Sequence, residues 1–210
     1  TDCVVTSGNA KKVIDSFPQD EKIIFGPDYN LGNYINSITG RNMLLWNGGC
    51  HVHEKFSVEA IGKLKQKHPE AVVMAHLECK APVLAVADVK GSTATMLHYA
   101  QEHPEIKEYI IATEAGILHE LERNCPNVIF YPVPPEVSEG GVGCSCNECE
   151  YMKMNTLKKI YNALKFGWPT VEVAPEIAKK AIKPIQKMLS LSYNNVVKII
   201  RLVVKIVFYG

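Results

Sequence analysis

Three closely spaced cysteines are the most specific chemical signal in this sequence. Cys144, Cys146 and Cys149 form a C-x-C-x-x-C pattern in a chain with 7 cysteines, an odd number. Together with the lack of a charged-then-apolar leader, this count argues against a secreted disulfide framework and favours thiols that bind metal or carry out redox chemistry. Three thiolates without a neighbouring histidine do not complete a tetrahedral zinc site, whereas an iron–sulfur cluster can take its cysteines from distant segments.

Cys50 is the second candidate metal ligand. It follows a predicted strand and two glycines and precedes His51-Val52-His53-Glu54. The carboxyl ends of parallel strands are where α/β proteins bind ligands, so a thiolate ligand is favoured over a packing cysteine at this place. His53 is a candidate for substrate contact or proton transfer, and a hydrogen-bonded structural histidine is the alternative.

A histidine and a carboxylate also end a predicted buried strand. In His76-Leu77-Glu78, strand alternation places His76 and Glu78 on the same side and Leu77 on the opposite side. Such a pair can bind a substrate and move protons, and it also occurs as a plain salt bridge. The spacing alone leaves both interpretations open.

Small hydroxyl residues precede two predicted helices. Ser7 stands before one helix, and Ser92 and Thr93 stand before another. Serine and threonine are favoured helix caps whatever the function. The same helix N-termini bind carboxylates or phosphates, so two of them facing one cavity would suit a substrate with several acidic groups.

These residues must be positioned by alternating strands and helices. The pattern predicts strands at 3–6, 23–25, 43–46, 71–75, 109–112, 128–131 and 171–173, with a further strand residue at Val89. Helices are predicted at 10–17, 31–38, 56–67, 82–87, 93–101, 114–123, 151–166 and 176–189. This alternation predicts an α/β fold with short parallel sheets.

The strand–helix order also repeats within the chain. An offset of 86, which aligns Asp2 with Asp88, lays Thr6-Ser7 on Ser92-Thr93 and residues 23–25 on 109–111. Each copy ends near a cysteine, Cys50 in the first and Cys149 in the second. The second copy has an opening strand at 71–78 without a counterpart in the first, so we expect the first copy to be an incomplete domain.

Composition excludes some partners. With 23 Lys and Arg against 22 Asp and Glu, the net charge is +1, which is not the basic field of a nucleic-acid binder. The stretch 193–210 is apolar with interspersed cations and is too short and too charged to span a bilayer. It fits a packed amphipathic helix, an edge strand or a membrane-surface helix. Without a targeting or membrane segment, we expect a cytoplasmic location and no membrane partner.

Several spaced motifs resemble those of the quinolinate synthase family. They run from residue 1 to about residue 192 in family order. The motifs are Thr6-Ser7-Gly8-Asn9-Ala10, Pro27-Asp28-Tyr29-Asn30-Leu31-Gly32, Gly49-Cys50 with Val52-His53-Glu54, His76-Leu77-Glu78-Cys79, Gly91-Ser92-Thr93, Thr113-Glu114-Ala115-Gly116-Ile117-Leu118-His119, and Cys149 with Tyr151-Met152-Lys153-Met154-Asn155-Thr156-Leu157.

The resemblance implies a fold and a cofactor. The family has three similar three-layer α/β/α domains in a pseudo-threefold arrangement, each giving one cysteine to a 4Fe-4S cluster that leaves one iron open for substrate. It implies that 1–68 is an incomplete second domain, that 69–192 is the third domain with the cluster-ligand loop and a C-terminal helix, and that 193–210 is an atypical amphipathic tail. Cys50 and Cys149 would be two of the cluster ligands.

The resemblance also implies a reaction and residue roles. The family condenses iminoaspartate with dihydroxyacetone phosphate to quinolinate for NAD biosynthesis, with release of phosphate and two waters, and aspartate oxidase is the upstream supplier. Glu78, His76 and His53 would be catalytic, with Glu78 a general base. Ser7, His76, Leu77, Glu78, Ser92 and Thr93 would contact the substrate.

Some positions depart from the family pattern. Leu77 and Glu150 each stand where the family usually has proline, and the first family domain, with its cysteine, has no counterpart here. We therefore expect this chain alone to lack synthase activity. The alternative from a different class is a non-catalytic α/β fragment that binds zinc through Cys144, Cys146 and Cys149.

Overall fold

The predicted α/β class with short parallel sheets is confirmed. The computed structural model describes residues 1–135 and 147–192, so Cys144, Cys146 and the stretch 193–210 lie outside the described residues. The chain divides into two compact units, Lys22–Leu157 and Thr1–Glu21 with Lys158–Gly210. The domain boundary near residue 68 that the resemblance implies stays a prediction.

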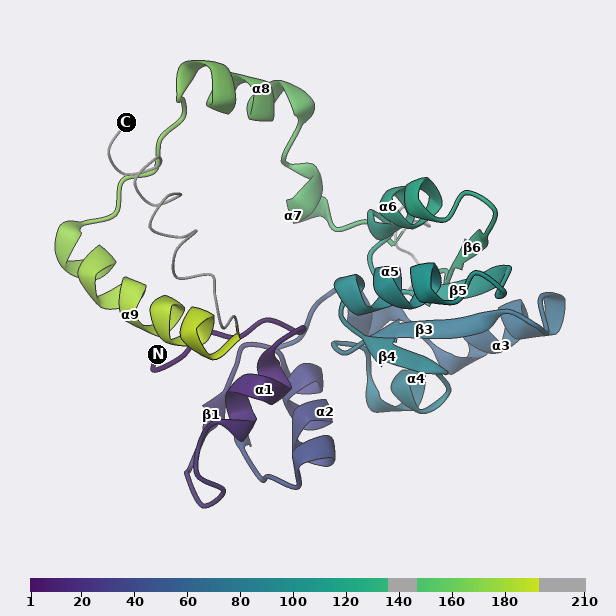
Figure 1. Cartoon of the computed structure of the whole chain (residues 1–210), viewed down its shortest axis with the longest axis horizontal. Coiled ribbons are helices and arrows are strands. Elements are labelled where there is room, and N and C mark those ends of the chain that lie inside the picture. The colour runs from purple at the N-terminus through teal and green to yellow at the C-terminus, as the bar shows by residue number, and fades with distance from the viewer. Residues whose placement is uncertain (136–146, 193–210) are drawn as a thin grey trace, which may run out of the picture. The chain divides into compact units, whose positions relative to one another are not determined.

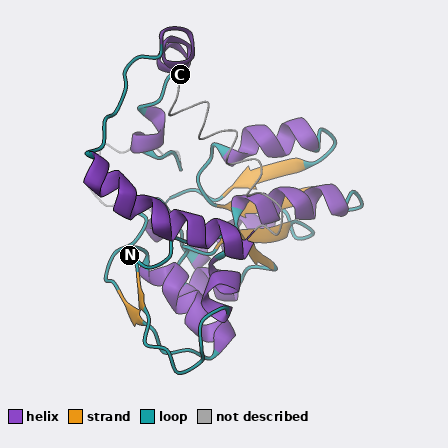
Figure 2. Ribbon diagram, turned by 60° about the vertical axis from the view of Figure 1, so that its left-hand side comes forward, coloured by secondary structure: helices purple, strands orange, loops and turns teal. Residues whose placement is uncertain are grey.

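A four-stranded parallel sheet is the centre of the first unit. Its order is β4 (Val89–Gly91), β3 (Val72–His76), β5 (Glu108–Ala112) and β6 (Ile129–Pro132), and every neighbouring pair is parallel. Figure 1 shows these strands side by side, and Figure 2 marks them in orange between helices.

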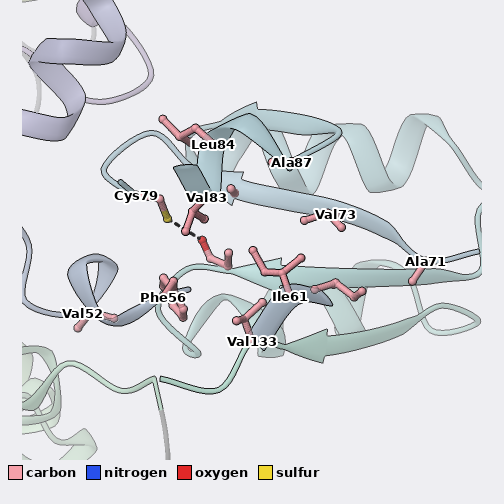
Figure 3. Close-up of a cluster of buried hydrophobic side chains, with 13 residues drawn as sticks. Val52, Phe56, Ile61, Ala71, Val73, Cys79, Val83, Leu84, Ala87 and Val133 are labelled. Atoms are coloured by element: carbon pink, nitrogen blue, oxygen red, sulfur yellow. Dashed lines mark hydrogen bonds between the residues drawn. The ribbon is translucent and has the colours of Figure 1, made fainter. Parts of the chain in front are cut away.

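Helices cover both faces of this sheet. Along β3, Val73 and Ala75 pack with Phe56, with Ile61 of α3 (Val58–Lys67) and with Val83 of α4 (Ala81–Ala85), as Figure 3 shows in part. Met74 points to the opposite face and packs with residues of α5 (Thr93–Glu102) and α6 (Ile117–Asn124). Since strands covered on both faces need apolar residues at successive positions, β3 is a continuous apolar run up to its terminal histidine.

The strand order reverses its direction between β3 and β5. The chain passes from β3 through α4 to β4, and then returns through α5 to β5 on the other side of β3. The helices that follow β3 and β5 therefore lie on opposite faces of the sheet, which is the topological switch point where open α/β sheets bind ligands. His76 ends β3, and Thr113 follows β5.

A smaller copy of the strand–helix–strand arrangement precedes this sheet. Strands β1 (Ile24–Phe25) and β2 (Leu44–Leu45) are parallel and are joined by α2 (Tyr29–Thr39). Asp28 caps α2 by accepting the Leu31 N–H, and Gly40 ends it with a left-handed φ of 67°, which glycine adopts without strain. The same order, β5–α6–β6, occurs in the larger sheet, as the sequence repeat predicts. Loop residues then lead to a 3₁₀ turn, η1 (His53–Lys55).

The second unit joins the start of the chain to its last described helix. Helix α1 (Ala10–Asp15) contacts α9 (Pro175–Ser192), and Asn9 Nδ2 donates to Ser192 Oγ at 2.9 Å. The backbone N–H of Val4 donates to the carbonyl of Pro184 at 3.3 Å. Helix α8 (Leu157–Phe166) has no buried residue.

Three predicted elements are wrong. Residues 3–6 and 171–173 form no strand; Val171 and Val173 are exposed, and β-branched residues favour a strand only where a neighbouring strand packs against them. The predicted helix 151–166 is two helices, α7 (Glu150–Lys153) and α8, separated at Asn155 and Thr156. Such side chains compete for backbone hydrogen bonds and disfavour a helix interior.

Among the described residues, the helices are all too short or too polar to cross a membrane.

Candidate active site

Side chains from three segments meet at the carboxyl ends of β3 and β5. Ligand atoms of Cys50, His53 and Glu78 all lie within 4.8 Å of one another. His53 is buried, while Cys50 and Glu78 are half-buried, so the group is partly open to solvent at the thiol and the carboxylate. The three atoms are a thiol sulfur, an imidazole nitrogen and a carboxylate oxygen, which are donors that transition metals accept.

His53 is the centre of this group. Its Nε2 lies 3.0 Å from Thr113 Oγ1, and its Nδ1 lies 3.2 Å from Glu78 Oε2. The ring stacks on His76 with 4.5 Å between centroids and 18° between planes. Because the contacts come from β3, β5 and η1, the sheet and the 3₁₀ turn together fix the orientation of the imidazole.

The surroundings of His53 favour its charged form. Burial alone would lower the pKa of His53, but the Cys50 thiol and the Glu78 carboxylate beside it outweigh burial and raise the pKa to about 9. The hydrogen bond from His53 lowers the pKa of Glu78, against the effect of burial. At neutral pH the pair is therefore an imidazolium beside a carboxylate.

Cys50 and His76 shift in ways that fit this charge. Burial acts to raise the pKa of the Cys50 thiol, but the hydrogen bonds and charge of His53 lower it overall, so the thiolate is favoured. Burial and then the His53 charge lower the pKa of His76 to about 4, so this ring is neutral at pH 7. Nδ1 of His76 accepts the backbone N–H of Glu78 at 3.3 Å, so in the neutral ring the Nε2–H is the donor that remains for a ligand.

Cys149 lies beside the same core. Cys50 and Cys149 are both half-buried and pack against the hydrophobic cluster that contains Phe56. Their segments touch directly, since the rings of His51 and Tyr151 meet edge to face with 5.4 Å between centroids. The two thiols therefore lie on contacting segments of the chain.

Cys79 does not belong with these thiols, although it adjoins Glu78 in the sequence. It is fully buried and its Sγ donates to the carbonyl oxygen of Ala112 at 3.4 Å (Figure 3). Burial raises the pKa of Cys79 to about 12. This cysteine is a core residue.

The hydroxyl candidates differ in availability. Ser92 is buried and caps α5, because its Oγ accepts the Thr95 N–H at 3.2 Å, whereas Thr93 is exposed. Gly91 pairs with His76 in the sheet, so this helix start lies next to the β3 end. Leu77 is buried, and its side chain is apolar.

Ser7 differs from its expected counterpart. The helix cap of α1 is Asn9 rather than Ser7, and Ser7 lies in the unit formed by the chain start and α9. The structure thus brings together Cys50, His53, His76 and Glu78. The predicted role of Ser7 in contacting the substrate stays a prediction.

Three residues of this region were not among the predicted site residues. Thr113 fixes the His53 ring, and Asp28 and Glu114 accept the backbone N–H groups of Cys50 and Cys149. The sequence held a signal for the last two, because the repeat offset of 86 aligns Asp28 with Glu114.

Comparison with known proteins identifies the family. The sequence model described as "Quinolinate synthetase A protein" matches residues 1–190. The chain belongs to the quinolinate synthetase A family. Curated quinolinate synthases that it resembles include those of Nostoc sp. strain PCC 7120, 44% identical over 192 residues, and Microcystis aeruginosa strain NIES-843, 43% identical over 192 residues.

The quinolinate synthetase A match covers only part of those relatives. The aligned residues are 91% of this chain but 57% of the Nostoc protein and 58% of the Microcystis protein. A relative from Synechococcus sp. strain ATCC 27144, 41% identical, is covered to 58% as well. The chain therefore spans somewhat more than half the length of the quinolinate synthases that it matches.

Proposed function

We propose that this chain provides two cluster ligands and the proton-transfer groups of a quinolinate synthase, which condenses iminoaspartate with dihydroxyacetone phosphate. The observation that carries the proposal is the convergence of Cys50, His53 and Glu78 within 4.8 Å at the sheet's switch point. Family membership supports this reaction, and the geometry offers side chains suited to it.

Cys50 and Cys149 would hold a 4Fe-4S cluster. Both thiols are accessible, lie on contacting segments and are distinct from the buried Cys79. When bound, the cluster supplies an open iron that acts as a Lewis acid toward a substrate hydroxyl or carboxylate.

Glu78 and His76 would handle substrate and protons. Glu78 stays ionised because His53 lowers its pKa, so it can accept a proton during condensation or ring closure. His76 is neutral, and its Nδ1 accepts the backbone N–H of Glu78 at 3.3 Å, so its Nε2–H would donate to a substrate oxygen. His53, held by Thr113, supplies positive charge beside the anionic groups of both substrates.

Anion binding would involve the start of α5. Thr93 has an exposed side chain at a helix N-terminus next to β3, which suits a carboxylate or phosphate. Ser92 would orient that turn through its cap, Leu77 would give apolar contact, and Ser7 would be a further hydroxyl contact. We place the reaction in the cytoplasm, where an oxidase acting on aspartate must supply the unstable imine.

The test is anaerobic reconstitution of the chain with iron and sulfide, followed by metal and sulfide counts and an absorption spectrum. We expect a broad band near roughly 400 nm from thiolate-to-iron charge transfer, lost in Cys50→Ser and Cys149→Ser. Cys125→Ser is the matched control, because Cys125 lies in the hydrophobic cluster on the other face of the sheet. A colourless protein containing zinc would instead favour the fragment that binds zinc through Cys144, Cys146 and Cys149.

A further inference from the structure

Two carboxylates hold the backbones of the two proposed cysteine ligands. Asp28 Oδ2 accepts a hydrogen bond from the backbone N–H of Cys50 at 3.0 Å. Glu114 Oε1 accepts one from the N–H of Cys149 at 3.2 Å. Asp28 comes soon after β1 and Glu114 soon after β5, so the same bond occurs in both copies of the repeat.

A second hydrogen bond accompanies each of these. The N–H of Tyr29 donates to the carbonyl of Gly48 at 2.7 Å, and the N–H of Ala115 donates to the carbonyl of Asn147 at 3.0 Å. Gly48 and Asn147 each stand two residues before their cysteine. We call these sets the Cys50 clamp (Asp28, Tyr29, Gly48, Cys50) and the Cys149 clamp (Glu114, Ala115, Asn147, Cys149).

The two clamps are related by the sequence repeat. Asp28 and Glu114 are 86 positions apart (114 minus 28), and Tyr29 and Ala115 are also 86 apart (115 minus 29). The segment between the carboxylate and its cysteine differs in length between the two clamps. Equivalent hydrogen bonds therefore persist although the intervening loops have diverged. Agreement at two pairs of bonds indicates a shared function for the clamp as well as a shared origin of the fold.

The second oxygen of each carboxylate ties the clamp to a helix. Asp28 Oδ1 accepts the N–H of Leu31 in α2 at 2.7 Å, and Glu114 Oε2 accepts the N–H of Gly116 at the start of α6, also at 2.7 Å. Each carboxylate thus bridges a helix N-terminus and a cysteine backbone. A side-chain amide has a single acceptor oxygen, so it can keep one of the two bonds but not both.

We propose that Asp28 and Glu114 are equivalent positioning residues that fix the main chains of Cys50 and Cys149, so that both thiolates are directed at one shared ligand. The inference rests on the proposed function, in which that ligand is the iron–sulfur cluster. Neither carboxylate needs to touch the cluster. Each acts through the cysteine's backbone, in the way that outer hydrogen bonds orient the ligands of other metal sites.

The first test uses the metal-free chain. Asp28→Asn and Glu114→Gln keep the side-chain shape and can keep the helix cap, so both variants should fold. We expect amide hydrogen exchange at Cys50 to rise about tenfold in Asp28→Asn, and at Cys149 by a similar factor in Glu114→Gln, through loss of one hydrogen bond. Asp88→Asn is the matched control, since Asp88 Oδ2 accepts the N–H of Val73 at 2.8 Å on another part of the sheet.

The second test uses the reconstituted chain. We expect a chelator to remove the cluster about 10–100-fold faster from Asp28→Asn and Glu114→Gln than from the unsubstituted chain and Asp88→Asn, with an altered paramagnetic resonance spectrum of the reduced cluster. If both variants show the same amide exchange rates and the same rate of cluster removal as the unsubstituted chain, the clamp proposal is overturned. The proposed function is not affected by that result. If the unsubstituted chain takes up no cluster, the proposed function fails, and hydrogen exchange alone decides whether the carboxylates position the cysteines.

Discussion

In the copy of the repeat that carries Cys50, the thiol lies among ionisable side chains, with His53 and Glu78 both in reach. In the copy that carries Cys149, the cysteine instead begins helix α7, and its carbonyl accepts the N–H of Lys153 at 3.0 Å. The backbone clamps match while the side-chain surroundings differ. The repeat has kept the backbone hydrogen bonds that hold each cysteine, whereas among the described residues the His53–Glu78 pair lies beside Cys50 and not beside Cys149.

The largest expected effect concerns which cysteines can react at all. In the folded, metal-free chain we expect Cys50 to be alkylated at neutral pH at least about a thousandfold faster than Cys79, because burial both shields Cys79 and raises its pKa to about 12. Peptide mapping by mass spectrometry after brief iodoacetamide treatment measures this. If Cys79 is labelled to the same extent in the folded chain as in urea, it is not a core residue.

Truncating a core side chain next to the Cys50 segment tests how much of the stability of that copy comes from hydrophobic packing. Phe56 is fully buried and its ring lies 6.1 Å from that of His53. We expect Phe56→Ala to lower the free energy of unfolding by about 3–5 kcal/mol, measured by urea denaturation. Trp46→Ala is the control, because Trp46 is 66% exposed and its loss should change stability by less than about 0.5 kcal/mol.

The hydroxyl that holds His53 belongs to the Cys50 surroundings alone. Thr113→Val preserves shape but leaves Nε2 of a buried, charged imidazole without its partner, at a cost of about 1–3 kcal/mol. Thr113→Ser should retain most of the stability. If valine and serine are tolerated equally in urea denaturation, Thr113 does not orient His53.

The two clamps differ at the residue two positions before the cysteine, which is Gly48 in the Cys50 clamp and Asn147 in the Cys149 clamp. A Cβ on Gly48 would lie 2.6 Å from the Pro27 carbonyl oxygen, so Gly48→Ala should cost about 1–2 kcal/mol. Gly62→Ala in α3 meets no atom within 4 Å and should stabilise by about 0.5–1 kcal/mol. Thermal unfolding of the pair should therefore shift in opposite directions.

The main strands and helices of the larger sheet could be predicted from the sequence, because buried parallel strands such as β3 are apolar runs bounded by turn residues. His76 Nδ1 and Glu78 Oε2 lie 4.0 Å apart on the same side, as predicted, but β3 ends at His76 and Glu78 is reached through a turn and not through strand alternation. The failure at 171–173 arose because exposed β-branched residues had no neighbouring strand, and the one at 151–166 because Asn155 and Thr156 interrupt the helix. The closeness of Cys50 to Glu78, and the role of Thr113, depend on which strands become neighbours, which no local pattern contains.

The two clamps could be predicted from the sequence only in part. The repeat aligns Asp28 with Glu114 in the sequence, but helix capping alone would explain an acidic residue just before a helix. Only the structure shows that the second oxygen of each reaches a cysteine backbone.

The edge-to-face contact of His51 with Tyr151 has a consequence for chain entropy. Bringing together two segments about 100 residues apart in an unfolded chain costs roughly 4–5 kcal/mol. Folding of the sheet, together with this aromatic contact, has already closed that loop before any ligand arrives. A ligand that bridged Cys50 and Cys149 would therefore bind without having to close the chain.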